Sequence, residues 1–415
     1  MTGHERESVA IVSSYDLNLT GGAEKSILNM LRYWKNFDWL YASHFSIPVL
    51  PCPTWQSRAS VHLPFIKRPL STLIEGRETA QAIAQKKWIL FESLSLHSMQ
   101  VLLAIPPVMR QERCLIMWRS EQSFIVPDFT PSRTRNTAYQ AYWLLNLLIK
   151  RNMANQVKYN LATSEATAKS LVQIGIRPET IRTIPEQVGG EFTPELRIQS
   201  GENLRLKFLD QDELGILVVS RVSPEKDLIW VAKLFDLLRK ERRFLHPDSP
   251  YKKIKISLAG PVSEQNKLYF DHLVWLITQS TNQTSTTHAA NSVSFTYLGC
   301  QPWEKLQEMY CAYDILFHPP ERKEGFGRVI VEGMSSGMTA IARKKCAPIA
   351  EILHEPPYQI GILVDTPNEA TGHILRLMSS PETLNELQEN ATRWANNHYS
   401  LEAAEKGFLN IFKDH

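Results

Sequence analysis

Several features are missing from this sequence of 415 residues, and each absence narrows the class of protein. The five cysteines form no Cys-x-x-Cys pair, which argues against a disulfide framework or a zinc site and favours reduced thiols in a cytosolic protein. No secretory signal is visible, because the charged start leads only into a short apolar run, Val9 to Val12. The longest strongly apolar helical stretch, Tyr142 to Ile149, is too short to span a bilayer. We therefore expect a cytoplasmic protein.

The sequence also lacks a large net charge. The formal value is +3 at pH 7, which does not suggest nucleic acid as a partner. In one region all charged residues are basic, because no acidic residue occurs between Phe129 and Ser164. Such a segment usually packs its apolar side on its own domain, but it could also contact an anionic membrane at the inner face or a charged acceptor. Its basic residues are Arg133, Arg135, Lys150, Arg151 and Lys158.

Short apolar segments of strand length alternate with longer segments of helical period along most of the chain. The chain is too long to fold around a single hydrophobic core, so we expect two domains of about 200 residues each. The alternation indicates an α/β protein with doubly wound parallel sheets, which bind ligands at the carboxyl ends of their strands. We expect strands at 9–13, 88–91, 115–118, 161–163, 215–220, 253–259, 293–297, 315–317, 339–342 and 362–364, helices at 23–34, 137–159, 227–239 and 263–278, and an exposed loop at 280–292.

The segment from Glu324 to Glu332 is the most informative part of the chain. An apolar strand runs into a loop with Gly325 and Gly327, and Glu332 follows on a helix. This layout lets backbone N–H groups approach an anion at a helix N-terminus, while the two carboxylates accept hydrogen bonds from hydroxyl groups. A nucleotide sugar carries both groups. The alternative is a helix-terminal carboxylate favoured by the helix dipole plus a surface glutamate.

Two cations follow the expected strand at 215–220. Arg221 and Lys226 would lie at the carboxyl edge of the second sheet, where they could neutralise a diphosphate and stabilise it as a leaving group. The alternative is a pair of surface salt bridges with Glu225 and Asp227.

Two glycines precede the first expected helix. Gly22 could let the backbone approach a phosphate there, although a simple tight turn explains the pair equally well. The sequence is not Gly-x-Gly-x-x-Gly, so we expect no dinucleotide site. His97 and His318 lie nearest to strand ends, and either could be a base, a hydroxyl ligand or a structural residue.

Taken in order, these motifs resemble family 4 of the retaining glycosyltransferases. The resemblance covers the second half nearly end to end and the first half more thinly. It rests on Gly-Gly-Ala-Glu24, Ser164-Glu165, Ser-Arg-Val-Ser-Pro-Glu-Lys226, Leu-Ala-Gly260, Tyr-Leu-Gly299, Ala-Tyr-Asp314, and Glu324-Gly-Phe-Gly through Glu332 to Gly337.

The resemblance implies the GT-B fold, in which two Rossmann-like domains face each other across a cleft. It implies an acceptor-side domain at 1–195, a nucleotide-sugar-binding domain at 196–397 and a C-terminal helix at 398–415 that crosses back to the first domain. Family members generally need no divalent metal, and no other cofactor is expected, because the donor nucleotide sugar is a substrate.

The resemblance also assigns roles on the donor side. It places Glu332 on the ribose, Glu324 with Gly325, Phe326 and Gly327 beside the donor sugar, and the base near Gly260. Arg221, Lys226 and the Gly22 loop would bind the diphosphate. Arg221, Lys226 and Glu324 are therefore the expected catalytic residues.

Three positions depart from the family pattern. A His-x-His pattern is missing at the strand that here ends Phe91-Glu92-Ser93. The next strand, which often ends in a histidine, here ends Trp118-Arg119-Ser120-Glu121, and Pro-Asn-Gly-Val is replaced by Pro185-Glu186-Gln187-Val188. All three fall on the acceptor side or near the reaction centre. The acceptor-side candidates are His97, Arg119 and Glu121.

The expected function is retaining transfer of a sugar from a nucleoside diphosphate sugar to an acceptor hydroxyl. A glycan, a lipid-linked molecule and a small molecule all remain open as acceptor. Two alternatives also remain: a sugar-nucleotide epimerase with the same fold, and a degenerate transferase that serves as a nucleotide-sugar-binding partner subunit.

Overall fold

The computed structural model describes residues 6–15, 17, 22–43, 50, 52–56, 68–119, 133–184, 186–188, 204–241, 249–283, 293–320, 324–354 and 358–413. The chain divides into two compact units. The first consists of Met1–Gln187 and Leu401–His415, and the second of Val188–Ser400. The division therefore falls after residue 187, where the sequence led us to expect it after 195, and the C-terminal segment joins the first unit at 401.

The first unit is built on a parallel sheet of seven strands in the order β3-β2-β1-β4-β5-β6-β7. The chain extends the sheet from β1 outward to β3 and then returns to the other side of β1 with β4, so the strand order reverses between β1 and β4. The strands are β1 (Glu7–Ser13), β2 (Phe37–Ser43), β3 (Thr54–Gln56), β4 (Trp88–Phe91), β5 (Cys114–Trp118), β6 (Tyr159–Ala162) and β7 (Ile181–Thr183).

Both faces of this sheet are buried, as the alternation of side chains along β1 shows. Val9 and Ile11 belong to one apolar cluster, while Ala10 and Val12 belong to the other, which is the period of two expected for a strand. A parallel sheet needs cover on both faces. The helices of this unit are α1 (Gly22–Tyr33), α2 (Arg68–Ile83), α3 (Leu96–Ala104), α4 (Pro107–Arg113), α5 (Arg133–Ala154), α6 (Glu165–Gln173) and α15 (Leu401–Ile411).

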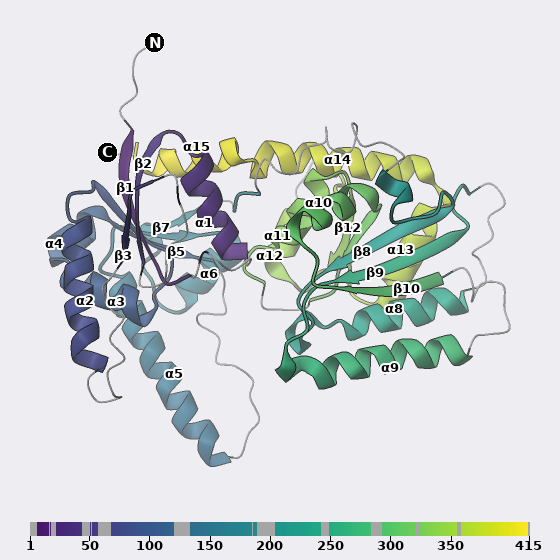
Figure 1. The fold of residues 1–415 in the computed structure, drawn as a ribbon, viewed down its shortest axis with the longest axis horizontal. Helices are drawn as coiled ribbons and strands as arrows, with labels where there is room; N and C mark the ends of the chain where they lie inside the picture. Colours follow the sequence, from purple (N-terminus) through teal and green to yellow (C-terminus); the bar gives the residue numbers. More distant parts are fainter. Residues whose placement is uncertain are drawn as a thin grey trace, which may run out of the picture. The chain divides into compact units, whose positions relative to one another are not determined.

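Helix α15 completes the core of the first unit. Phe408 packs 5.3 Å from Trp34, and Phe412 packs 4.6 Å from Trp88, measured between ring centroids. Figure 1 shows α15 beside α1, as their contacts require. Residues from the last segment of the chain therefore bury aromatic side chains of the first strands.

The second unit has a parallel sheet of six strands in the order β10-β9-β8-β11-β12-β13. Its order reverses between β8 and β11, which lie side by side in the centre. The strands are β8 (Glu213–Val219), β9 (Lys253–Ala259), β10 (Val293–Gly299), β11 (Ile315–His318), β12 (Thr339–Arg343) and β13 (Gly361–Val364).

The helices of the second unit cover the two faces of this sheet with separate apolar clusters. Helices α8, α9 and α13 supply one cluster, and α10, α11, α12 and α14 supply most of the other. Their bounds are α8 (Ile229–Lys240), α9 (Lys267–Gln283), α10 (Trp303–Ala312), α11 (Arg328–Ser335), α12 (Ala347–Leu353), α13 (Pro367–Ser379) and α14 (Pro381–Tyr399). Within the ranges given above, no helix combines the length and the apolar character that crossing a bilayer requires.

The ten expected strands are all present, two of them, β4 and β9, with the expected bounds. The helix expected at 137–159 is wrong at its end, because α5 stops at Ala154 and Tyr159 already begins β6. The loop expected at 280–292 is wrong at its start, because α9 continues to Gln283, and 284–292 lies outside the described residues. Strands β2, β3 and β7 were not anticipated.

Candidate functional site

An ion pair marks the point where the strand order of the second sheet reverses. Lys226 lies in the loop after β8 and Glu324 in the loop after β11, and Lys226 Nζ binds Glu324 Oε1. Both side chains are 14% exposed. In doubly wound sheets, ligands bind outside the carboxyl ends of the strands at this reversal. Two residues predicted from the sequence are thus brought together where a ligand is expected.

Glu324 is held as a carboxylate by its surroundings. Burial alone would raise its pKa, but the hydrogen bond from His318 and the charge of Lys226 outweigh burial and lower the pKa to about 2. His318 ends β11, and its Nε2 atom lies 3.5 Å from Glu324 Oε1. The carboxylate is therefore ionised at neutral pH and can accept hydrogen bonds from hydroxyl groups.

The turn that carries Lys226 is fixed by a contact of the next residue, Asp227. Pro224–Lys226 forms a single turn of 3₁₀ helix, and Asp227 follows with φ of 47°, a left-handed conformation that costs energy for a residue with a side chain. Asp227 Oδ2 accepts a 2.5 Å hydrogen bond from Arg343, whose guanidinium lies 4.1 Å from the Trp230 ring. This anchor positions the preceding lysine.

Arg221, the other predicted cation, is placed differently. Its side chain is 68% exposed, and its guanidinium lies 3.8 Å from Glu225, four residues further along the chain. Such an exposed pair contributes little stability. The guanidinium is consequently available to a ligand, while Lys226 is already held by a carboxylate.

Glycines let backbone segments come close around this site. A Cβ atom at Gly260 would lie 1.8 Å from the carbonyl oxygen of Ser220, which immediately precedes Arg221. At Gly327, the residue that caps α11, φ is 93° and a Cβ atom would meet Ile349 at 1.9 Å. Only glycine fits either position. Phe326, between Gly325 and Gly327, is buried and lies 5.3 Å from the Tyr399 ring, so its side chain anchors the loop.

Glu332 lies on α11 with only 5% of its surface exposed. Tyr310 donates a 2.9 Å hydrogen bond to Oε2, and Arg328 Nη2 lies 3.4 Å from Oε1. Burial raises the pKa of Tyr310 well above its usual value, and the neighbouring Glu332 carboxylate adds to this, so the phenol stays protonated and donates. The carboxylate that we predicted for a ribose is therefore held in one orientation.

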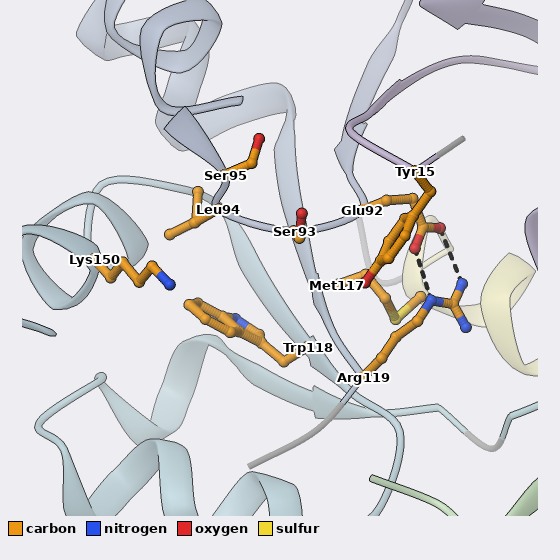
Figure 2. A pocket seen from close by; sticks show the side chains of 9 residues that line it. All are labelled: Tyr15, Glu92, Ser93, Leu94, Ser95, Met117, Trp118, Arg119 and Lys150. Carbon is orange, nitrogen blue, oxygen red and sulfur yellow. Dashed lines mark hydrogen bonds and ion pairs between the residues drawn. The ribbon is translucent and has the colours of Figure 1, made fainter. Parts of the chain in front are cut away.

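The first unit contains a second cluster at the corresponding edge of its sheet. Arg119, directly after β5, donates to both oxygens of Glu92 at 2.8 and 3.0 Å, and to Glu186 at 2.6 Å (Figure 2 shows the pair with Glu92). Ser26 accepts a further hydrogen bond of 2.9 Å. Burial alone would lower the pKa of Arg119, but the two carboxylates raise it above its usual value. The three charges form one buried network.

These three charged residues stand at the three positions where the sequence departs from the expected family pattern. Glu92 replaces part of the missing His-x-His, Arg119 stands in place of a histidine, and Glu186 in place of an asparagine. Sequence reasoning noted each departure separately and proposed only Arg119 as a site residue. Their complementary charges, two acids and one base, were the signal that could have linked them.

The remaining predicted positions are less informative. Gly22 is the first residue of α1, and residues 18–21 before it lie outside the described residues. Glu121 also lies outside them. His97 is buried on α3 and does not line the cavity described next.

A cavity of about 180 Å³ opens beside the Arg119 network. Figure 2 shows the side chains around it, which come from the loops after β1 and β4, the end of β5, and α5. The lining residues are Tyr15, Glu92, Ser93, Leu94, Ser95, Met117, Trp118, Arg119 and Lys150. Of these, only Arg119 was predicted.

Residues 202–394 match the family model described as "Glycosyl transferases group 1". No curated protein matches the sequence significantly. Among solved structures, Anabaena Alr3699/HepE in complex with UDP and glucose is 16% identical with a TM-score of 0.69, covering 99% of this chain and 100% of its own. Sucrose-phosphate synthase from Thermosynechococcus elongatus is 17% identical with a TM-score of 0.70, covering 99% of both chains. WaaG, a glycosyltransferase involved in lipopolysaccharide biosynthesis, is 12% identical with a TM-score of 0.62, covering 96% and 98%. These likenesses confirm the expected GT-B fold.

Removing the cation beside Glu324 tests the electrostatics of the second unit. We expect Lys226→Met to lower the free energy of unfolding at pH 7 by about 1–3 kcal/mol, because it leaves a largely buried carboxylate without its partner. The folded-state pKa of Glu324 is depressed from 4.5 to about 2, so the stabilisation is present above about pH 4.5 and is lost as the pH falls towards 2. Urea unfolding of both proteins between pH 7 and 3 measures the difference. A difference that stays constant over this range would contradict the assignment, and Lys233→Met, at an exposed position on α8, is the control.

Proposed function

We propose that this chain, a glycosyltransferase by the family of its second unit, transfers a sugar with retention of configuration from a nucleoside diphosphate sugar to an acceptor hydroxyl. The observation that carries the proposal is the Lys226–Glu324 ion pair at the strand-order reversal of the second sheet. It lies inside the matched segment and is flanked by Arg221, Glu332 and the glycine loop.

In this proposal the second unit binds the donor. Glu332, fixed by Tyr310, accepts hydrogen bonds from the ribose hydroxyls, and Glu324 accepts them from the donor sugar. Arg221 and Lys226 bind the diphosphate, while the base lies near Gly260. The Anabaena protein was crystallised with UDP and glucose, so UDP and its sugars are the first nucleotides to test.

The chemistry follows from the charge that develops on the leaving diphosphate. As the glycosidic bond breaks, the diphosphate gains negative charge, which Arg221 and Lys226 stabilise. The departing diphosphate oxygen accepts the proton of the acceptor hydroxyl, which attacks from the same face, so configuration is retained. Two fixed cations take the electrostatic role that a divalent metal would otherwise have, and we propose that transfer needs no metal or other cofactor.

Replacing Lys226 should slow the chemical step. Loss of one such preorganised contact typically costs about 2.7–4 kcal/mol of barrier, so we expect Lys226→Ala to lower turnover by roughly 10²–10³-fold. Turnover is measured as release of the nucleoside diphosphate from the donor that gives activity. Lys233→Ala should leave turnover unchanged, and near-normal turnover of Lys226→Ala would remove this lysine from the mechanism.

Product analysis with donor alone separates transfer from epimerisation, and binding without any turnover would indicate a degenerate partner subunit.

Nucleotide binding should depend on Glu332. A hydrogen bond to a charged group is worth about 1.5–3 kcal/mol, so we expect Glu332→Ala to weaken binding of the nucleoside diphosphate by about 10- to 100-fold. A thermal-shift panel of UDP, GDP and other nucleoside diphosphates identifies the base, and calorimetry then gives the affinity. A ligand at about 100 times its Kd should add about 2.7 kcal/mol of stability to the wild-type protein. Unchanged affinity in Glu332→Ala, compared with the exposed control Glu304→Ala, would exclude the ribose role.

We further propose that the protein is cytoplasmic and that α5 contacts the anionic inner face of a membrane. Four apolar side chains form one exposed face of this helix, which carries basic residues and no acidic one. Apolar side chains beside cations are typical of helices that lie in an anionic lipid surface. The exposed residues are Leu144 (57%), Leu145 (58%), Leu148 (41%) and Ile149 (44%).

Co-sedimentation with vesicles tests this contact. We expect the protein to sediment with vesicles that contain anionic lipid, and to do so less at higher salt because the attraction is partly electrostatic. The double variant Leu144→Ser/Leu148→Ser should lose most of this binding, since it removes apolar area from the face. Leu268→Ser, at an 84% exposed position in the second unit, is the control. Equal binding of both variants would exclude α5 as the contact.

A further inference from the structure

The cavity of the first unit combines groups that recognise two different features of a ligand. A volume of about 180 Å³ corresponds to about six water-sized volumes, which suits one ring-sized ligand better than an extended chain. Its walls carry a lysine and hydroxyl groups (Figure 2).

Lys150 is the cation of this cavity. It lies on the side of α5 opposite to the exposed apolar face, and Figure 2 shows its ammonium group pointing towards Trp118. Burial lowers the pKa of Lys150, and no carboxylate among the described residues pairs with it. Desolvating an ammonium group without a counter-ion is unfavourable. An anionic group of a ligand would supply the missing partner.

The opposite wall offers hydroxyl groups. Glu92 lies behind them with none of its side chain exposed, and Arg119 binds both of its oxygens. Burial, together with the nearby Glu92 and despite Arg119, raises the pKa of Tyr15 to about 12, so its phenol remains a donor at neutral pH. Ser93 adds a further hydroxyl. These groups suit a molecule with several hydroxyl groups.

Trp118 supplies a rigid wall between these two sides. Its indole Nε1 donates a 2.9 Å hydrogen bond to the buried side chain of Asn160. The ring therefore keeps its orientation and, with only 3% of the residue exposed, forms a rigid base for the cavity.

We propose that this cavity binds the acceptor, and that the acceptor is a hydroxylated ring that carries an anionic group, phosphate or carboxylate, paired with Lys150. Ser93 and Tyr15 bind the ring hydroxyls. This inference rests on the proposed transferase function, which it extends by naming the chemical class of the acceptor.

Binding of matched probes to the full-length protein, without any donor, tests the inference separately from transfer. The pairs are glucose against glucose 6-phosphate, glucose against glucuronate, and myo-inositol against myo-inositol 1-phosphate, measured by calorimetry or ligand-observed NMR. We expect at least one anionic member to bind about 10- to 100-fold more tightly than its neutral partner. Success with the phosphates or with glucuronate identifies the anion. Vesicles with phosphatidylinositol, compared with free inositol phosphate, show whether a lipid carries the ring.

The variants decide whether Lys150 is responsible. Lys150→Met should abolish the preference for the anionic member, Lys150→Arg should retain most of it, and Lys169→Met, at an exposed position of α6 in the same unit, should leave it intact. The inference is overturned if no pair shows a preference, or if Lys150→Met keeps it. Because donor binding to the second unit is measured independently, failure here leaves the transferase proposal standing, and absent donor binding would disprove that proposal alone.

Discussion

The ion pair between Lys226 and Glu324 joins the two loops that follow the central strands of the second sheet. Every other feature of the candidate donor site is arranged around it. The Asp227–Arg343 contact fixes the turn behind the lysine, and Gly327 lets α11 begin close enough to place Glu332 nearby. A largely buried pair of this kind persists only if each charge has its partner. A site built in this way is electrostatically complete before a ligand arrives, so a bound phosphate or sugar hydroxyl replaces or extends existing contacts instead of creating them.

The first unit also pairs charged residues inside the protein, but with a different set of side chains. Where the family pattern places histidines and an asparagine, this chain has Glu92, Arg119 and Glu186, which satisfy one another in a buried network. Changing one of these residues alone would leave a buried charge uncompensated, which is strongly destabilising. The three departures are therefore physically coupled.

Much of the fold could be predicted from the sequence, because short continuous segments carry the pattern of each strand or helix. Buried parallel strands such as Trp88–Phe91 are short apolar runs bounded by polar residues, and glycines beside Glu324 and Glu332 indicate a loop that enters a helix. Strand β2 was missed because Phe37–Ser43 contains Asp38 and follows the preceding helix without a clear break. The site was predicted only where a single segment carries the signal. The contacts of Glu92 with Arg119 and of Lys150 with the cavity join segments far apart in the chain, and no spacing along the sequence encodes them.

The return of α15 to the first unit has a consequence for synthesis of the chain. A nascent polypeptide emerges with its N-terminus first, so the strands of the first unit leave the ribosome long before Phe408 and Phe412, which cover Trp34 and Trp88. The second unit is contiguous from Val188 to Ser400 and can bury its own core earlier. During that interval Trp34 and Trp88 lack this cover, and transiently exposed apolar surface of this kind is prone to aggregation. Residues that are translated after the whole second unit thus complete the folding of the first.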